Sequence, residues 1–505
     1  MDNTLQNAYN SIVSTNLLYQ NNRARWQFLL ESYLGGDDYR NGGHLTKYSM
    51  ETAGEYNARL NATPLDNQCR SIISTYTSFL FRECAERDYG SLTTNLNLPA
   101  FLEDADLDGR SLEAFMKDVS IWASVFGHCW VMVAKPQSNV ATRADELSQG
   151  IRPYVNLITP LTVTDWTWAR SSSGAYTLTY LKYIEEVNDT LSTIKEWSET
   201  EIRTSVVNHN TRKVVNEIIE VNGLGKIPAV IAYAARSPVR GIGASLITDI
   251  ADMQKKIYNE YSEVEASIRL NGHPTLVKTA EVECSAGAGA VAIMPDGMDP
   301  GLVPYMLTVS TNIDSIYSSI NSSIAAIDKM ANTGAVRAVQ SSSMSGVAIE
   351  TEFQLLNAKL SEIADGLELA EEQIWRLWAL YEGGAWDGEI DYPGSFNIRD
   401  TQNEFASLQT AKQAATGIDA MSLIDLRLRQ LLEDPRLSSE VEEPEEQAQY
   451  AVELAVLADS AVVASDIVPP QPEELWEFLK WMHLNMAQSQ LLRLLPKLQK
   501  MARIH

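Results

Sequence analysis

The stretch GLGKIP, Gly223–Pro228, has the glycine and lysine of a phosphate-binding loop. Such a loop follows the pattern GxxxxGK[ST] and opens a helix. Here no Ser or Thr follows the lysine, and Pro228 prevents an immediate helix. Two other stretches, GIGAS at Gly241–Ser245 and SAGAGAVA at Ser285–Ala292, show only closely spaced small residues. We expect a turn before a strand at the first, helix entry at the second, and a loop or tight packing contact at the third.

Residues suited to metal binding or acid–base chemistry are dispersed. The six histidines, at positions 44, 128, 209, 273, 483 and 505, show neither HxH nor HExxH spacing. Carboxylate pairs such as Asp249 and Asp252 could be ligands, but solvated helix faces or ion pairs between subunits are the interpretation we favour. The sequence therefore predicts no catalytic residue, no cofactor and no metal, and a protein that is not an enzyme.

Composition limits the class of partner. The 505 residues carry a net charge of −26, and 45% are hydrophobic, which suits a globular protein of several domains. Proteins that bind nucleic acid tightly present basic surfaces, so this chain either has nothing to do with DNA or approaches it without adhering. Acidity that merely aids solubility is the competing interpretation.

No apolar run is long enough to cross a bilayer, and the N-terminus lacks the pattern of a signal peptide. The four cysteines form no CxxC pair, which predicts reduced thiols in a cytosolic setting. These features predict no contact with a membrane.

Periodicity divides the first half of the chain into helices and then strands. We predict helices within Thr15–Gly36, after Pro64 and up to Gly127, with polar loop sequence before Thr63. From Cys129 to Val221 the pattern changes to β-branched and aromatic runs, which predict a mixed or antiparallel sheet.

The second half begins with two amphipathic helices around a short β-containing excursion. The first carries one apolar stripe over about 40 Å, at Leu246, Ile250, Met253, Ile257, Tyr261, Val264 and Ile268. The second, Asn312–Asn332, has isoleucines on one side and mostly Ser and Ala on the other. A narrow apolar stripe requires a partner helix or a neighbouring subunit.

The stretch GAVRAVQSSSMSGVAIETEF, from Gly334, joins a serine-rich loop to a long heptad-like helix. Its first sixteen residues contain a single charge, Arg337. Farther on, residues 433–477 contain thirteen acids and one Arg, whereas the tail from Lys480 is basic and contains no acid. That tail could face DNA or an acidic neighbour, and complementation of a helix dipole is an equal alternative.

In this order of elements the chain resembles the portal proteins of tailed double-stranded-DNA bacteriophages, in particular the long-tailed phage family. The resemblance covers roughly Ala58–Gly383 and rests on four quoted segments: ARLNATPLDNQCRSIISTYTSFLFRE, RPYVNLITPLTVTDWTW, GLGKIPAVIAYAAR with GASLITDIADMQKKIYNEYSEVEASIRLNGHPTLVKT, and AIETEFQLLNAKLSEIADGLELAEEQIWRLWALYEG. It implies an α+β, predominantly helical subunit with wing, stem, clip and crown, which assembles into a ring around a central channel.

The resemblance also implies how the chain divides. Its parts are N-terminal helices and a wing sheet (1–241), stem helix 1 (242–270), a clip (271–311), stem helix 2 (312–332), a tunnel loop (333–346), a long wing helix with a strand region (347–400) and a helical crown (401–505).

The implied function is a ring, usually of twelve subunits, at one capsid vertex of the virion, assembled in the host cytoplasm. Double-stranded DNA would pass through it during packaging and ejection. The expected partners are the terminase large subunit, the head–tail adaptor, and the major capsid and scaffold proteins. Two alternatives remain: another helical head, connector or scaffold component, and, with less support, a packaging ATPase.

Three sets of residues are assigned roles on this basis. The tunnel loop would contact DNA through Arg337, Gln340, Ser341, Ser342, Ser343 and Met344. The clip would dock terminase or the adaptor through Glu281, Glu283, Asp296 and Asp299. The stem would form oligomer contacts through Ile250, Ile257, Tyr261, Ile316, Ile320 and Ile324.

Overall fold

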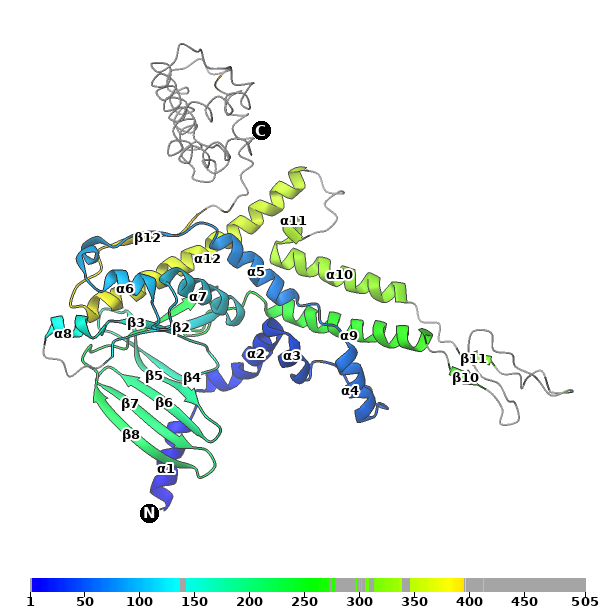
Figure 1. Ribbon diagram of the computed structural model, residues 1–505, viewed down its shortest axis with the longest axis horizontal. Helices are drawn as coiled ribbons and strands as arrows, with labels where there is room; N and C mark the ends of the chain where they lie inside the picture. Colours follow the sequence, from blue (N-terminus) through cyan, green and yellow to red (C-terminus); the bar gives the residue numbers. More distant parts are fainter. Residues whose placement is uncertain are drawn as a thin grey trace, which may run out of the picture. The chain divides into compact units, whose positions relative to one another are not determined.

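The computed structural model describes residues 2–136, 142–272, 275–277, 297, 299, 301, 305–307, 313–337, 346–394, 396 and 412. The chain divides into two compact units, Met1–Asn397 and Ile398–His505. The predicted crown, 401–505, lies outside the described residues except for Lys412, and so does the basic tail. The first unit combines helices and antiparallel sheets, which confirms the α+β class (Figure 1).

The N-terminal part of the unit is helical. The predicted helices correspond to α2, α5 and α7, but the segment expected to be a loop before Thr63 also forms α3 and α4. The described elements here are α1 (Asp2–Val13), α2 (Leu17–Leu34), α3 (Gly36–Asn41), α4 (Ala53–Ala62), α5 (Gln68–Leu80), a 3-10 helix (Gly90–Thr94), α6 (Leu98–Glu103), α7 (Leu112–Phe126) and α8 (Arg143–Ser148).

Local signals in the sequence set the ends of these helices. The Ser111 side chain accepts a hydrogen bond from the Ala114 N–H at the start of α7. Gly127 ends α7 with φ 91°, a left-handed conformation in which a Cβ would also lie 2.6 Å from the backbone of Ala244. Strand β2 begins at His128, directly after this glycine, and packs on α7.

Two separate antiparallel sheets form where one sheet region was predicted. The smaller has the order β3–β2–β9 and the larger the order β4–β5–β6–β7–β8. Their strands are β2 (His128–Ala134), β3 (Tyr154–Ile158), β4 (Val163–Arg170), β5 (Tyr176–Val187), β6 (Leu191–Ser198), β7 (Glu201–Asn208), β8 (Lys213–Val221) and β9 (Ala229–Tyr233).

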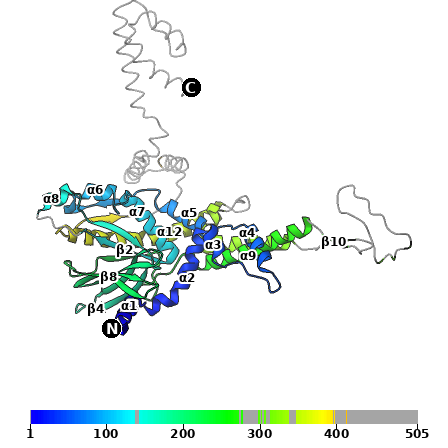
Figure 2. The ribbon, with the colours of Figure 1, turned by 60° about the horizontal axis from the view of Figure 1, so that its bottom comes forward.

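The main core lies where these sheets meet each other and the helices. Trp130 of β2 and Trp166 of β4 are both buried, with ring centroids 6.2 Å apart. Helix α7 packs on β2, and α12 (Gly346–Tyr381) packs on β9 and β2 (Figure 1, Figure 2). The long helix predicted from the heptad-like pattern is therefore anchored in the core, with buried residues from Leu356 onward.

A buried ionic cluster fixes α12 to a small two-stranded sheet, β1 (Glu86–Asp88) with β12 (Glu389–Asp391). Arg87 donates to both carboxylate oxygens of the fully buried Glu371, at 2.6 and 3.1 Å, and to Glu113 at 2.7 Å. The Tyr392 O–H donates to Glu371 at 2.6 Å, and burial raises the pKa of Tyr392 well above its usual value. The Glu371 charge is thus fully compensated inside the core.

Substituting Arg87→Met should destabilise this unit by about 3–5 kcal/mol, because it leaves the Glu371 carboxylate buried without its cation. The measurement is urea unfolding followed by tryptophan fluorescence. Trp375 lies at the cluster, where its N–H donates to Glu371, and contributes to that signal.

The matched control is Arg376→Met on α12, the helix that carries Glu371. It removes an exposed ion pair to Glu372 and should cost about 0–1 kcal/mol. Equal losses for the two variants would contradict a special role for the buried cluster.

Candidate functional site

The site begins with two helices that run side by side in opposite directions (Figure 1). They are α9 (Thr248–Gly272) and α10 (Ile313–Ala331), the two predicted stem helices. The Lys256 ammonium of α9 donates to Ser323 at 2.8 Å and to Ser319 at 3.3 Å, and the Ser319 O–H donates to Glu260 at 2.7 Å. These polar contacts fix the register of the pair.

Helix α9 starts later than the predicted Ile242. The segment before it forms other backbone hydrogen bonds instead: the Ala244 N–H donates to the Ala235 carbonyl at 2.9 Å, and the Leu246 N–H to the distant Ser124 carbonyl at 3.1 Å. Apolar periodicity does not encode these bonds, so it predicted a first turn that the structure does not have.

The apolar stripe of α9 and α10 is covered within the chain. Ile250, Ile257 and Ile320 are 2%, 1% and 1% exposed. These three side chains pack into the core of the subunit itself, and an oligomer contact of the two stem helices stays a prediction. The other three residues of that set, Tyr261, Ile316 and Ile324, are partly buried against the same core.

The opposite side of α10 is exposed and mostly small or polar. Its exposed positions include Asp314, Tyr317, Ser318, Asn321, Ser322, Ala325, Lys329 and Met330. The two charged ends have opposite sign, and the middle of this face carries no charge. Such a face offers a DNA backbone few attachment points.

The turn that follows α10 is fixed to α5. The Tyr76 O–H donates to the Ala331 carbonyl at 2.5 Å, and burial raises the pKa of Tyr76 to about 12, so the donor keeps its proton. The Thr333 N–H donates to Asp328 at 2.9 Å, and Asn332 adopts a left-handed φ of 55°. Helix α10 therefore ends at a rigid corner.

The first residues of the predicted tunnel loop form a short helix, α11 (Gly334–Arg337). The Arg337 guanidinium donates to Asp328 at 2.7 Å and to the Gln68 side chain, and both members of the ion pair are largely buried. A contact between Arg337 and DNA would require this ion pair to open. The remaining loop residues, Gln340 and Ser341–Met344, lie outside the described residues.

The predicted clip is described only in part. Strand β10 (Thr275–Val277) pairs antiparallel with β11 (Tyr305–Leu307), which joins the far ends of α9 and α10. Asp299 is exposed and accepts a hydrogen bond from the Gly301 N–H at 2.9 Å. Glu281, Glu283 and Asp296 lie outside the described residues.

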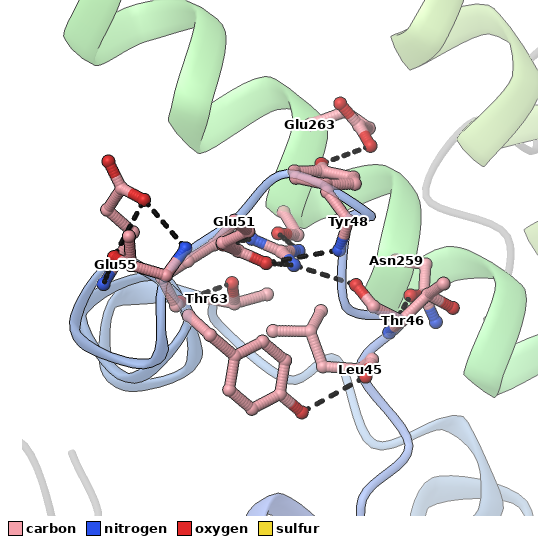
Figure 3. A network of polar contacts seen from close by, with 12 residues as sticks. Leu45, Thr46, Tyr48, Glu51, Glu55, Thr63, Asn259 and Glu263 are labelled. Atoms are coloured by element: carbon pink, nitrogen blue, oxygen red, sulfur yellow. Dashed lines mark hydrogen bonds and ion pairs between the residues drawn. The ribbon is translucent and has the colours of Figure 1, made fainter.

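A polar network holds the segment around α4 against the outer side of α9. Arg59 donates to both oxygens of Glu51, at 2.9 and 2.8 Å, and to the buried Ser262 hydroxyl of α9 at 2.8 Å. Figure 3 shows the Tyr48 side chain reaching Glu263, to which its O–H donates. The Arg59 guanidinium also lies 4.0 Å from the centroid of the Tyr48 ring.

The sequence did not predict this polar network around Arg59, or the contacts of Gln68 and Tyr76. One local signal was present, since Thr52 and Glu55 form a capping box at the start of α4. Nothing local pairs Arg59 with Ser262, or Tyr76 with Ala331, because each contact joins residues about 200 or more positions apart.

The described histidines are hydrogen-bonded to side chains or backbone groups of the fold. His44 contacts Glu31 at 2.7 Å, and His209 lies between the hydroxyls of Tyr9 and Ser192. Burial lowers the pKa of His128 to about 3, so its ring stays neutral and accepts a hydrogen bond from the Gly243 N–H at 3.2 Å.

Metal sites and membrane spans were searched over the same described residues. Nowhere in them do three His, Cys, Asp or Glu side chains gather as metal ligands would. No helix in the described part of the chain has both the length and the apolar content needed to cross a bilayer.

Neither the family models nor the curated proteins contain a match to this chain. Among solved structures, a chain from the neck of an empty gene transfer agent (GTA) particle with C6 symmetry has a TM-score of 0.44 and 8% identity, covering 71% of this chain and 89% of that one. A chain from the virion of the native GTA particle has a TM-score of 0.42 and 8% identity, covering 79% and 98%. A chain from the native neck with C12 symmetry has a TM-score of 0.40 and 8% identity, covering 70% and 89%.

Replacing Arg337 by Met should loosen α11 without unfolding the unit, because the variant loses only the bonds to Asp328 and Gln68. We expect faster hydrogen exchange at the amides of Val336 and Arg337, which donate to Thr333 at 3.0 and 2.9 Å.

The control is Lys329→Met, which removes an exposed cation from the same corner. Unchanged exchange in the Arg337 variant, or the same increase in both variants, would contradict the anchoring role of the Arg337–Asp328 pair.

Proposed function

We propose that this chain is the subunit of a phage portal: a ring at one capsid vertex through which double-stranded DNA is packaged and ejected. The observation that carries the proposal is the order of elements from α9 to α12. The paired strands β10 and β11 lie between the antiparallel helices α9 and α10 in the chain, and the fixed corner after α10 precedes α12, a 36-residue helix. This is the stem, clip, stem, tunnel loop and wing order of the family that the sequence resembles.

Charge supports a channel rather than a binding groove. A conduit must let DNA slide, and every phosphate that a cation neutralises adds salt-dependent affinity. The chain has a net charge of −26, the middle of the exposed α10 face is uncharged, and Arg337 is already paired with Asp328. The loop would thus approach DNA mainly through Gln340 and the serines at 341–343.

The partners follow from the same assignment. Twelve copies would form the ring, the clip acids Glu281, Glu283, Asp296 and Asp299 would dock the terminase large subunit and later the head–tail adaptor, and the wing and crown would face the major capsid and scaffold proteins. The protein would act without catalysis or cofactor. Another helical head or connector component could share the acidity and the helices, but not the helix–clip–helix–loop–helix order. A packaging ATPase would need a phosphate-binding loop and would hydrolyse nucleotide.

Electron microscopy of the purified protein tests the assignment, with nucleotide hydrolysis measured on the same sample. We expect rings with a wide central hole that form without nucleotide, and no hydrolysis. Monomers only, or filaments without a hole, would remove the portal assignment; nucleotide hydrolysis would favour the ATPase.

The loop assignment has its own test. Replacing Ser341, Ser342 and Ser343 together by proline should reduce DNase-protected DNA per head while rings still assemble, since proline restricts the backbone that must adjust to moving DNA. The matched triple alanine variant keeps backbone freedom and should package more DNA than the proline variant. Heads filled normally by the proline variant would count against a DNA-contacting loop.

A further inference from the structure

A basic cleft lies beside the larger sheet, away from α9 and α10. Its volume is about 670 Å³, and it is formed by β4, the start of β5, β9 with the segments before and after it, Glu199, and Gln373 of α12. The lining includes the aromatic side chains of Trp168, Tyr176 and Tyr233 and the aliphatic side chains of Leu178, Ile227 and Ile231. Leu178, Ile227 and Ile231 are at most 9% exposed, so the floor of the cleft is apolar.

The rim of the cleft carries cations that form no ion pair with any carboxylate in the described part of the chain. Arg236, Arg240 and Lys226 line it together with one acid, Glu199. Over the described residues, none of these three cations forms an ion pair, although most arginines elsewhere in the unit do. In a chain of net charge −26, three unpaired cations around one hollow form a local surface of opposite sign.

Aromatic rings hold both arginines in place. The Arg240 guanidinium lies 4.0 Å from the Tyr176 ring centroid and 5.8 Å from that of Trp168, and Arg236 lies 5.5 Å from the ring of Tyr233. These cation–π contacts orient the guanidinium groups and leave their N–H donors for an incoming acceptor.

The loop that carries the arginines is braced at several points. Arg236 forms a β-bridge with Gly243, and the Gly241 N–H donates to the Tyr233 hydroxyl at 3.2 Å. Gly241 has φ 83°, and a Cβ there would lie 2.4 Å from Trp166, so the backbone is packed directly on the core. A rim this well fixed loses little conformational entropy when it binds.

We propose that this cleft is an intersubunit contact that receives an acidic, partly apolar segment of a second copy of this chain. The inference rests on the proposed ring and names one surface that would hold it together. Carboxylates of the neighbour would pair with Arg236 and Arg240, and an apolar side chain between them would cover the Leu178–Ile231 floor.

Charge complementarity selects a second copy as the occupant. Contacts in a ring are heterologous, so one face of a subunit meets a different face of the next. Both faces come from a chain with 66 acids and 40 lysines and arginines, and two acidic faces would repel. A cationic receptor on one face removes that repulsion, and the unpaired rim of the cleft has the required sign.

Charge reversal tests the contact. The double variant R236E/R240E should raise the protein concentration at half-assembly by about tenfold or more, measured by light scattering and size-exclusion chromatography. The neutral variant R236Q/R240Q should fall between this variant and the wild type, and its assembly should respond less to added salt. The matched control Arg212→Glu changes an exposed arginine outside the cleft and should assemble like the wild type.

Cross-linking identifies the occupant. With a photoreactive benzoylphenylalanine in place of the exposed Val239 at the cleft, assembled rings should give cross-linked pairs of chains that join position 239 to an acid-rich peptide. Cross-links confined to single chains, or none in assembled rings, would overturn the proposal.

The assembly data separate the two proposals. If wild-type chains form rings and R236E/R240E, with an unchanged circular dichroism spectrum, forms them at the same concentration, the cleft contact fails and the portal assignment stands. If the wild type forms no ring under any salt condition, both fail.

Discussion

Helix α9 packs against α2, α4, α5 and α10, and each contact removes part of its apolar stripe from water. Ile250, Ile257 and Val264 are at most 2% exposed, and burial of such side chains contributes favourable hydrophobic free energy to this packing. Because four helices pack on α9 at once, the position of each of them is restricted by the others. This packing sets the positions of the turn after α10, of the polar network around Arg59 and of helix α11.

Polar contacts then fix where the packed helices lie along one another. Lys256 with Ser319 and Ser323 fixes the register of α10 on α9, and Tyr76 with Ala331 fixes where α10 ends. In the second half of α12, the buried Arg87–Glu371 pair holds this helix against β1 and β12. Helices α11 and α12, which flank residues 338–345 in the chain, are thus each held by contacts to other parts of the unit.

Charge is distributed unevenly over this scaffold, in a way that total composition conceals. The net charge of −26 predicts weak interaction with DNA, and the Arg337–Asp328 pair strengthens that expectation at the base of the loop. The unpaired arginines Arg236 and Arg240 form an exception on another surface. The proposed channel can interact weakly with DNA and still bind adjacent subunits, because the two kinds of contact use different residues.

The sequence by itself determined the elements whose signals are local. Apolar spacing predicted α9, α10 and α12, and β-branched runs predicted the strands from Cys129 to Val221, because burial of one face imposes a period on neighbouring residues. Only the tertiary structure decided which residues cover that face. Ile250, Ile257 and Ile320 serve the interior of the subunit, Arg337 pairs with Asp328, and the cleft gathers Trp168, Lys226 and Arg240 from separate segments. Such contacts join residues distant in the chain, and periodicity does not encode their pairing.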